Sequence, residues 1–464
     1  MKMNFMIFDL TLLGLFLIFV VAFLYRKRKK IQREGLLFLY RTSWGIKLIE
    51  KTGKKYKKTL QILSHFSVWL GYALMGIMVY LFGRIIYIYI FHADIVRAVK
   101  IPPIMPLVPY LPQMFKLSFL PPFYFSYWII VLAIIAITHE FFHGIFASIA
   151  KVKTKTTGFG FFPFFLPVFL AAFVELDEKA MVKKSNFKQR AVLSAGTFAN
   201  TLTAILGIIL MFGFFSLTFS PAGVVYDDYA YDVVNISSIK TINGFPLENS
   251  SELGKLKTAE IKVNGQTYYA LKQIDLKNSL VALYYDSPAI NQNLTGAIIS
   301  INGEKIKDLG KLTSEMEKYS PEETIVLETF DGQEKKFKNI TLGESPEGNA
   351  WLGITFLEQK PKGVLATISA WTTSYKKAHI YYEPDWEFAQ YIYDLLWWLV
   401  LISFSVALVN MLPVGIFDGG RFFYLTILSI TKSQKKAEKA FKGITKFFLF
   451  LLFVVMFFWA KSFF

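Results

Sequence analysis

Long apolar stretches alternate with charged stretches along the 464 residues of the chain. A helix needs about 20 consecutive apolar residues to cross the hydrocarbon core of a bilayer. Six stretches reach this length, and we expect them to be membrane-spanning helices: residues 5–25, 65–91, 126–150, 190–218, 391–413 and 443–463. The hydrophobic pattern therefore predicts a polytopic α-helical membrane protein.

The first apolar stretch ends at Tyr25 and is followed directly by five basic residues, 26–30. A cleaved signal peptide carries its positive charge before the apolar run and ends in small residues. The order is reversed here. We therefore expect an uncleaved span whose N-terminus lies outside the cell.

The formal net charge of +17 is concentrated beside the apolar stretches. Residues 26–58 contain 13 Lys and Arg but only two Glu. Basic residues beside spans mark cytoplasmic loops and attract anionic lipid. This distribution indicates membrane topology, with lipid and not nucleic acid as the partner of the basic residues. The predicted cytoplasmic segments are 26–64, 151–189 and 431–442, and the predicted outer segments are 92–125 and 220–390.

The outer block 220–390 differs from the rest of the chain in charge and in pattern. It holds 17 Lys and Arg against 23 Asp and Glu, a net charge of −6. Short alternating runs bounded by glycine are typical of β-strands, as in 296–303 and 324–332. The tripeptide Ile-Asn-Gly occurs at 242–244 and again at 301–303, and we expect a hairpin tip at each. The block is thus predicted to be two small β-rich modules in tandem.

One apolar segment, residues 158–176, is too short and too interrupted to span. It contains Pro163 and Pro167. Non-helical backbone at membrane depth must be buried in protein or line a cavity. We predict a re-entrant hairpin that dips into the membrane from the cytoplasmic side.

The strongest chemical signal is His139-Glu140-Phe-Phe-His143, inside the third span. Histidines at i and i+4 lie one turn apart on one helix face, so both can bind one Zn²⁺. Glu140 is placed to move protons for a metal-activated water. Ionisable residues are costly inside a membrane and are functional by default. The sequence therefore predicts a metal site here, and the absence of cysteine leaves His, Asp and Glu as its ligands.

A catalytic zinc needs a third protein ligand and an open position for water. Asp418 is the one carboxylate between Asp394 and Glu438, and Pro413 before it would break the fifth span. The break would let this carboxylate turn toward the helix bundle. The alternative is an Asp-Gly turn at a cytoplasmic helix end, where Arg421 pairs with the helix dipole.

The chain resembles the site-2 protease family of intramembrane metalloproteases. Two elements carry the resemblance, His139-Glu140-x-x-His143-x-x-x-Ala147 and Asn410-x-x-Pro413-x-x-x-x-Asp418-Gly419. They occur in the family's order, with an inserted domain between them. The resemblance implies zinc bound by His139, His143 and Asp418, with Glu140 as the catalytic acid and base. It also implies a catalytic core of three spans, 126–150, 190–218 and 391–424.

Two asparagines are candidates for substrate binding. Asn200 lies in Ser-Ala-Gly-Thr-Phe-Ala-Asn, which resembles a third family signature although Thr197 stands where proline is usual. It is a candidate to hydrogen-bond the substrate or the developing oxyanion, and the alternative is a polar contact between helices. Asn410 would bind unwound substrate backbone or cap its own broken helix.

The stretch 287–303 of the outer block resembles PDZ modules, although Thr295-Gly296 replaces the usual Gly-Asp. Such a module would bind a peptide terminus by strand addition, or would exclude large outer domains by size. The expected organisation places PDZ-like modules outside the cell, between core spans. Its segments are 1–64 (first span and basic segment), 65–125 (second span and outer loop), 126–218 (core), 219–390 (PDZ-like tandem), 391–430 (core) and 431–464 (basic loop and last span).

The predicted function is hydrolysis of peptide bonds within the membrane-spanning segments of single-span proteins. His139 begins about 13 residues from the outer end of its span, or roughly 20 Å, which places the site toward the cytoplasm. One alternative is a prenyl-protein peptidase, which would use a downstream Glu as third ligand. Others are a non-catalytic receptor or scaffold that binds peptides through its PDZ-like modules, and a metal transporter. The identity of the substrate and the oligomeric state stay open.

Overall fold

The computed structural model describes residues 2–34, 37–92, 96–97, 102, 105–117, 119–161, 170–246, 259–270, 279–332, 334–357, 363, 367, 370 and 374–461. The chain divides into two compact units. The first, the helical unit, consists of Met1–Met211 and Tyr391–Phe464. The second, the β-rich unit, is Phe212–Gln390. The predicted outer block 219–390 falls within the β-rich unit.

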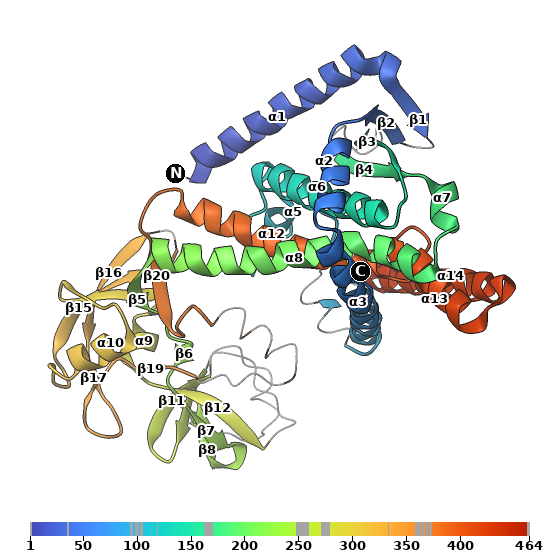
Figure 1. The fold of residues 1–464 in the computed structure, drawn as a ribbon. Helices are drawn as coiled ribbons and strands as arrows, with labels where there is room; N and C mark the ends of the chain where they lie inside the picture. Colours follow the sequence, from blue (N-terminus) through green and yellow to red (C-terminus); the bar gives the residue numbers. More distant parts are fainter. Residues whose placement is uncertain are drawn as a thin grey trace. The chain divides into compact units, whose positions relative to one another are not determined.

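Six long helices are apolar enough to cross a membrane, and each overlaps one of the predicted spans. The shortest has 22 residues, which gives about 33 Å at 1.5 Å per residue and exceeds the hydrocarbon thickness of about 30 Å. The six predicted spans are therefore confirmed as helices (Figure 1). They are α1 (Lys2–Lys27), α3 (Lys57–Phe91), α6 (Phe125–Ile149), α8 (Asn186–Thr218), α12 (Ala389–Asn410) and α14 (Gln434–Lys461).

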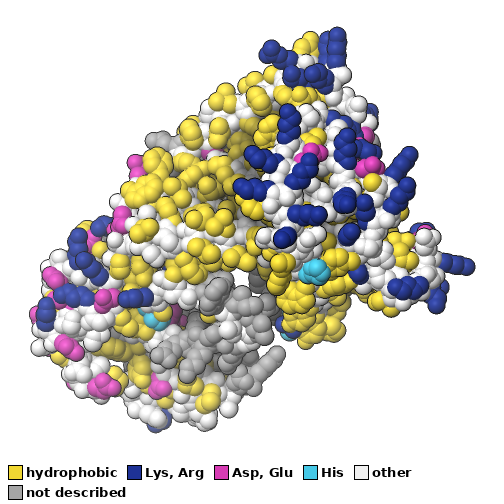
Figure 2. All heavy atoms as spheres, viewed as in Figure 1, with side chains coloured by type: hydrophobic (Ala, Val, Ile, Leu, Met, Phe, Trp, Pro, Cys, Tyr) yellow, Lys and Arg dark blue, Asp and Glu magenta, His cyan; other side chains and the backbone are white. Residues whose placement is uncertain are grey.

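The outer faces of these helices carry large apolar side chains. Ile18 of α1 is 67% exposed and Phe453 of α14 is 70% exposed. Figure 2 shows hydrophobic side chains over the long helices, while Lys and Arg gather over the part of the helical unit that holds the short strands. Soluble proteins rarely expose apolar surface on this scale. The helical unit is therefore that of a multi-pass membrane protein.

The basic segment after α1 is folded, which the sequence pattern did not predict. It forms η1 (Arg28–Lys30), β1 (Ile31–Glu34), β2 (Leu37–Thr42) and α2 (Ile46–Lys55). Strand β2 pairs with β3 (Thr154–Phe161), which pairs with β4 (Leu170–Leu176). The result is an antiparallel sheet in the order β1-β2-β3-β4, with β4 at one edge. The predicted hairpin 158–176 thus becomes two of four strands, and its tip with Pro163 and Pro167 lies outside the described residues.

Helix α2 packs closely on α6 because glycine lies at both contacts. A Cβ added to Gly144 of α6 would lie 2.8 Å from Ile49 of α2, and one added to Gly53 of α2 would lie 2.7 Å from the Ser148 hydroxyl of α6. Any larger residue at these positions would separate the helices. The basic N-terminal segment is consequently held against the helix that carries the His-Glu-x-x-His motif.

The fifth span breaks where proline predicts it. Helix α12 ends at Asn410, residues 411–417 form turns, and α13 (Asp418–Thr431) begins at Asp418. The chain reverses so tightly that a Cβ on Gly419 would lie 2.4 Å from the Met411 backbone, and one on Gly420 would lie 2.4 Å from the Val414 carbonyl oxygen. The two glycines after Asp418 therefore permit the turn that brings this carboxylate back to the bundle.

A buried carboxylate joins α1 to the start of α6. Asp9 is fully buried, and it accepts hydrogen bonds from the backbone N–H of Phe125 at 2.7 Å and of Ser126 at 2.9 Å. The Tyr110 hydroxyl donates to the same side chain at 2.5 Å. The first N–H groups of a helix have no partner within the helix. Asp9 supplies that partner from another span, so α1 caps the helix that bears the motif.

The β-rich unit contains two modules with separate cores. One sheet has the order β7-β12-β11-β10-β8-β9, and the other has the order β16-β15-β13-β5-β20 with β14 beside β13. Ile261 and Leu283 are fully buried in the first core, and Ile298 and Leu327 in the second. The strands are β5 (Phe219–Val224), β6 (Asp228–Tyr229), β7 (Tyr231–Asn235), β8 (Ile239–Ile242), β9 (Phe245–Pro246), β10 (Ala259–Val263), β11 (Gln266–Ala270), β12 (Leu280–Tyr285), β13 (Ala297–Ile301), β14 (Glu304–Lys305), β15 (Thr324–Phe330), β16 (Lys335–Thr341), β17 (Gly343–Glu344), β18 (Ala350–Trp351), β19 (Ile354–Thr355) and β20 (Ile380–Pro384).

Both predicted hairpin tips are confirmed. Asn243 and Gly244 join β8 to β9 with φ of 48° and 83°, and Asn302 and Gly303 join β13 to β14 with φ of 49° and 85°. Two successive positive φ angles define the type I′ turn that Asn-Gly favours. A two-module β-rich insertion is therefore present. Its likeness to PDZ domains stays a prediction.

Replacing Asp9 with Ala is expected to destabilise the helical unit. The change leaves two backbone N–H groups and one hydroxyl without their partner in a buried site, at about 1–3 kcal/mol for each group. We expect the unfolding temperature in detergent to fall by about 5–10 °C. Thr11→Ala is the matched control, because its hydroxyl bonds only within α1, to the Ile7 carbonyl. Equal melting temperatures for the two variants would contradict this role of Asp9.

Candidate metal centre

Helix α6 carries both predicted histidine ligands on one face. The ring centroids of His139 and His143 are 4.7 Å apart, and their Nε2 atoms are 3.0 Å apart. His139 is buried and His143 is half-buried. Their spacing of four residues, just over one helical turn, is what turns the two rings toward a shared point.

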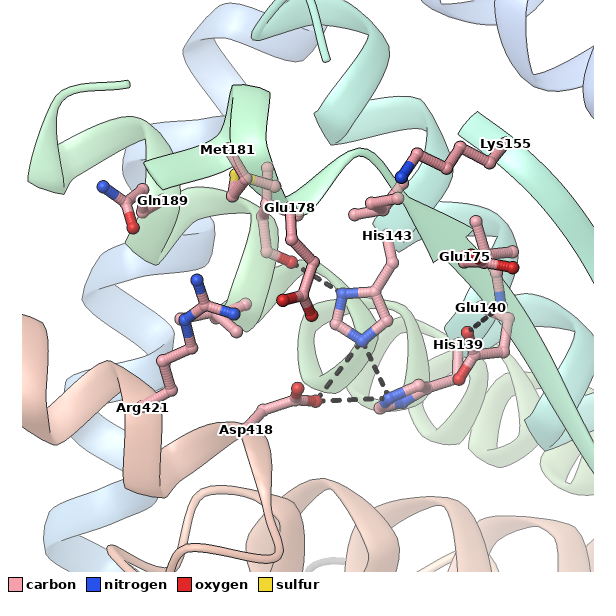
Figure 3. A pocket seen from close by; sticks show the side chains of 14 residues that line it. His139, Glu140, His143, Lys155, Glu175, Glu178, Met181, Gln189, Asp418 and Arg421 are labelled. Carbon is pink, nitrogen blue, oxygen red and sulfur yellow. Dashed lines mark hydrogen bonds and ion pairs between the residues drawn. The ribbon is translucent and has the colours of Figure 1, made fainter. Parts of the chain in front are cut away.

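Asp418 meets both rings from the other end of the chain. Its Oδ2 lies 3.4 Å from the His139 Nε2 and 3.3 Å from the His143 Nε2. Figure 3 shows this carboxylate pointing at the two imidazoles from the first turn of α13. Within the described residues these three side chains are the one group of His, Asp and Glu with ligand atoms close enough to hold a metal ion. The structure thus brings together the two sequence motifs.

The separations of the three ligand atoms fit a tetrahedral zinc site. Bonds of about 2.0–2.1 Å at tetrahedral angles place neighbouring ligand atoms about 3.3–3.4 Å apart. The observed separations are 3.0, 3.3 and 3.4 Å. The Nδ1 of His143 lies 2.7 Å from the Val192 carbonyl oxygen, which only accepts hydrogen bonds. This fixes the proton on Nδ1 and leaves the Nε2 lone pair for a metal.

Gly196 of α8 makes room for the two imidazoles. A Cβ added there would lie 2.4 Å from the His139 Nε2 and 2.5 Å from the His143 Nε2. No side chain larger than hydrogen can occupy this position while the rings stay in place. Helix α8 therefore forms the floor of the site, and its glycine shapes the space in which the ligand atoms converge.

Asn200, one turn further along α8, contacts the second nitrogen of His139. It is fully buried, and its amide lies 3.0 Å from the His139 Nδ1. Its Oδ1 has no hydrogen-bond partner in the orientation with Nδ2 toward the ring. Turning the amide by 180° lets the Nδ1–H donate to Oδ1 and frees Nε2 for a metal. The geometry therefore favours Asn200 as a residue that orients His139. Of the two readings of the sequence, it agrees with the polar contact between helices, and binding of substrate or oxyanion stays a prediction.

Glu140 is anchored to the edge of the four-stranded sheet. Its Oε2 accepts a hydrogen bond of 2.8 Å from the backbone N–H of Val174 in β4. The second carboxylate oxygen is not held by this bond. Glu140 lines the same cavity as His139, His143 and Asp418. The strand thereby fixes the direction of the Glu140 carboxylate, which lies outside the ligand group.

The cavity has a volume of about 390 Å³ and a polar wall (Figure 3). Besides the ligands and Glu140, its polar side chains are Lys155, Glu175, Glu178, Gln189 and Arg421. Glu175 accepts hydrogen bonds from Thr156 at 2.7 Å and from Arg41 at 3.1 Å, which together hold the pKa of its carboxyl below the usual value. Polar groups around a space of this size can keep water beside the histidines.

Asn410 stands apart from the other predicted residues. It ends α12, is half-buried, and is not one of the residues that line the cavity. Its proposed contact with substrate stays a prediction. Sequence reasoning also missed Gly196 and Val174, and it treated Arg421 only as a partner of the helix dipole. Of these, only Gly196 lay within a recognised motif.

These features define a class of protein: a multi-pass membrane protein whose His-Glu-x-x-His helix forms a three-ligand metal site beside a polar cavity. The chain belongs to peptidase family M50, the site-2 protease family, because the family model matches residues 127–455. Members of this family are zinc metalloproteases. A search of the curated proteins found no match. The match covers both motifs and more than two thirds of the chain, and the resemblance inferred from the sequence is confirmed.

Gly196→Ala is expected to weaken metal binding while leaving the fold intact. The added methyl group displaces one or both imidazoles, so we expect at least a 10- to 100-fold loss of zinc affinity, the range found for disturbed outer-shell partners. Chelator competition on purified protein measures this. Gly213→Ala is the control, because a Cβ there meets nothing within 4 Å. Wild-type affinity in Gly196→Ala would show that α8 does not shape the site.

Asn200→Ala is expected to lower zinc affinity by about 10- to 100-fold, because His139 loses the partner that fixes its tautomer. Asn200→Asp keeps an oxygen acceptor and should retain more of the affinity. Thr203→Ala serves as the control, since that hydroxyl bonds only to the Ala199 carbonyl of its own helix. An Asn200→Ala protein that binds zinc normally yet loses activity would instead favour a direct contact with substrate.

Proposed function

We propose that this protein is an intramembrane zinc metalloprotease that hydrolyses peptide bonds within the membrane-spanning segments of single-span proteins. The observation that supports this most is the convergence of His139, His143 and Asp418 within 3.4 Å of one another beside Glu140. The three ligands would hold zinc. The chemistry that zinc supplies when bound is Lewis acidity, which activates water and polarises a carbonyl.

Glu140 is the proposed general base and general acid. The backbone N–H of Val174 holds its Oε2, so the other carboxylate oxygen is available to a water molecule in the cavity. Glu140 takes a proton from the attacking water and then passes it to the nitrogen of the leaving amine. A fixed carboxylate performs both transfers without a large rearrangement.

Strand β4 is the proposed docking edge for the substrate. The carbonyl groups of a helical substrate are engaged in their own hydrogen bonds, so the segment must unwind before water can attack. An extended segment can then pair with the edge of a sheet. Because β4 is the edge of the order β1-β2-β3-β4 and also carries the N–H that holds Glu140, pairing there would bring the substrate backbone to the metal site.

The proposed sidedness follows from charge. Lys and Arg gather over the strands of the helical unit (Figure 2), and basic residues are retained on the cytoplasmic face of membranes. The metal centre would then open toward the cytoplasm. The acidic β-rich unit would lie outside the cell.

The β-rich unit is proposed to meet the outer part of the substrate. The sequence left peptide binding and size exclusion open. A groove of about 440 Å³ lies between α10 (Leu309–Met316) and the segment that holds β18 and β19, with apolar side chains such as Leu312, Leu352 and Ile354 in its wall. An apolar groove beside a strand suits an extended peptide, so it supports peptide binding.

Three rival functions differ from the proposal in testable ways. A prenyl-protein peptidase would use a glutamate as third ligand, whereas an aspartate carboxylate lies beside both histidines. A non-catalytic receptor or scaffold would not need Glu140 beside the ligands. A metal transporter would need further ligand groups along a path, and the described residues contain one such group.

Two substitutions separate these functions. Glu140→Gln removes the proton acceptor and should lower the cleavage rate of a fluorescent transmembrane substrate by about 10²- to 10⁴-fold with zinc still bound. Asp418→Ala should abolish both zinc content and cleavage.

Glu438→Gln, an exposed position on α14, is the control for loss of an acidic side chain. Unchanged cleavage by Glu140→Gln would overturn the protease assignment. Unchanged zinc content in Asp418→Ala would overturn the assignment of the third ligand.

A further inference from the structure

Arg421 lies in the wall of the metal cavity. It is half-buried and lines the same space as His139 and Asp418. Figure 3 shows its side chain reaching into the cavity from the first turn of α13, beside Asp418. The two residues are three positions apart on one helix, so their Cβ atoms are about 5–6 Å apart on one face. The length of an arginine side chain is enough to bring its guanidinium to a group bound at the three ligands.

The guanidinium of Arg421 has no protein partner among the described residues, with neither a hydrogen bond nor an ion pair. Other arginines of the helical unit do have partners: Arg41 bonds Glu175 at 3.1 Å, and Arg190 bonds the Tyr72 hydroxyl at 2.8 Å. A guanidinium offers five N–H donors in a plane that matches a carboxylate. The N–H donors of this half-buried arginine are therefore available to bind an anion.

The acidic groups of the cavity lie on other elements. Glu175 belongs to β4 and Glu178 to α7 (Glu178–Val182), whereas Arg421 belongs to α13. Glu175 is already paired with Arg41, and it does not neutralise Arg421. Lys155 of β3 also lines the cavity, so Arg421 is the cationic side chain that α13 contributes to it.

Peptide hydrolysis produces one charge of each sign. Water adds its oxygen to the carbonyl carbon, the C–N bond breaks, and the nitrogen takes the proton delivered by Glu140. The carbonyl fragment becomes a carboxylic acid that releases its proton, and the amine fragment gains one. Negative charge develops on the carbonyl oxygens from the transition state onward.

We propose that Arg421 is a catalytic residue that binds these negatively charged oxygens, first in the transition state and then as the carboxylate of the new C-terminus. This inference rests on the proposed function. The ligand class is a peptide carboxylate. The orientation that follows places the fragment with the new C-terminus toward α13.

The first test is kinetic. Loss of one group that stabilises a developing oxyanion lowers kcat by about 10²- to 10³-fold. We expect this loss in Arg421→Gln with zinc content unchanged and KM altered far less, and a smaller loss in Arg421→Lys, which keeps the charge without the planar fork. Lys435→Gln, an exposed position in the first turn of α14, should cut like the wild type.

The second test is binding, and it does not depend on turnover. Full-length Glu140→Gln protein with zinc bound is titrated with a product peptide that ends in a carboxylate and with the same peptide ending in an amide. We expect the acid to bind at least about 10-fold more tightly, and we expect adding Arg421→Gln to reduce that preference by about 10-fold. If Arg421→Gln does not fold, Arg421→Lys takes its place, with a several-fold reduction expected.

The outcomes are separable. A wild-type protein that cuts no transmembrane substrate refutes the proposed function. A wild type that cuts, together with an Arg421→Gln protein of equal kcat and equal preference for the acid, refutes only the role of Arg421. If Arg421→Gln keeps the wild-type kcat and the preference for the acid but binds more weakly to vesicles that contain anionic lipid, the arginine binds a lipid phosphate. That result would also overturn the proposal.

Discussion

The arrangement of the helical unit is constrained by a cluster of three ionisable side chains, which is tolerated among apolar helices only because the three side chains contact one another. His139, His143 and Asp418 would each be costly to bury alone in a membrane-spanning bundle. Their ligand atoms lie 3.0–3.4 Å apart, which lets them share one cation or share protons. These short distances require α6 and α13 to approach each other closely at one point. The reversal of the chain after α12 brings the start of α13 to that point. The tight turn with Gly419 and Gly420 is therefore a condition of the site and not an accident of the loop.

The surrounding elements form hydrogen bonds to the polar atoms of the site that do not face the metal position. Helix α8 contributes the Val192 carbonyl to His143 and the Asn200 amide to His139, and its Gly196 leaves the space that both rings need. Strand β4 holds Glu140 through the Val174 N–H. His143, His139 and Glu140 thus each have one polar atom held by the scaffold and another free for chemistry. Such contacts from outside the ligand group keep the directions of these side chains constant.

Local patterns predicted much of this structure, and long-range pairing accounts for what they missed. Six spans follow from hydropathy, two hairpin tips follow from Asn-Gly, and the paired histidines follow from helical spacing. Asp418 could be predicted because a proline precedes it and no other carboxylate lies nearby in the sequence. The four-stranded sheet was not predictable, since Leu39 of β2 pairs with Gly160 of β3, a partner that no pattern near either residue specifies. The bond between Asp9 and the start of α6 escaped prediction for the same reason.

The N-terminal segment contacts the elements that form the metal centre, although the family match begins only at residue 127. Asp9 caps α6, and Ile49 packs against Gly144 one residue beyond His143. Arg41 donates to Glu175 at 3.1 Å, and the preceding residue of β4, Val174, donates its backbone N–H to Glu140 at 2.8 Å. A displacement of β2 would therefore move β4 and with it the Glu140 carboxylate. The segment before the family match thus stabilises β4 through the sheet, and β4 is the strand at which we propose that the substrate docks.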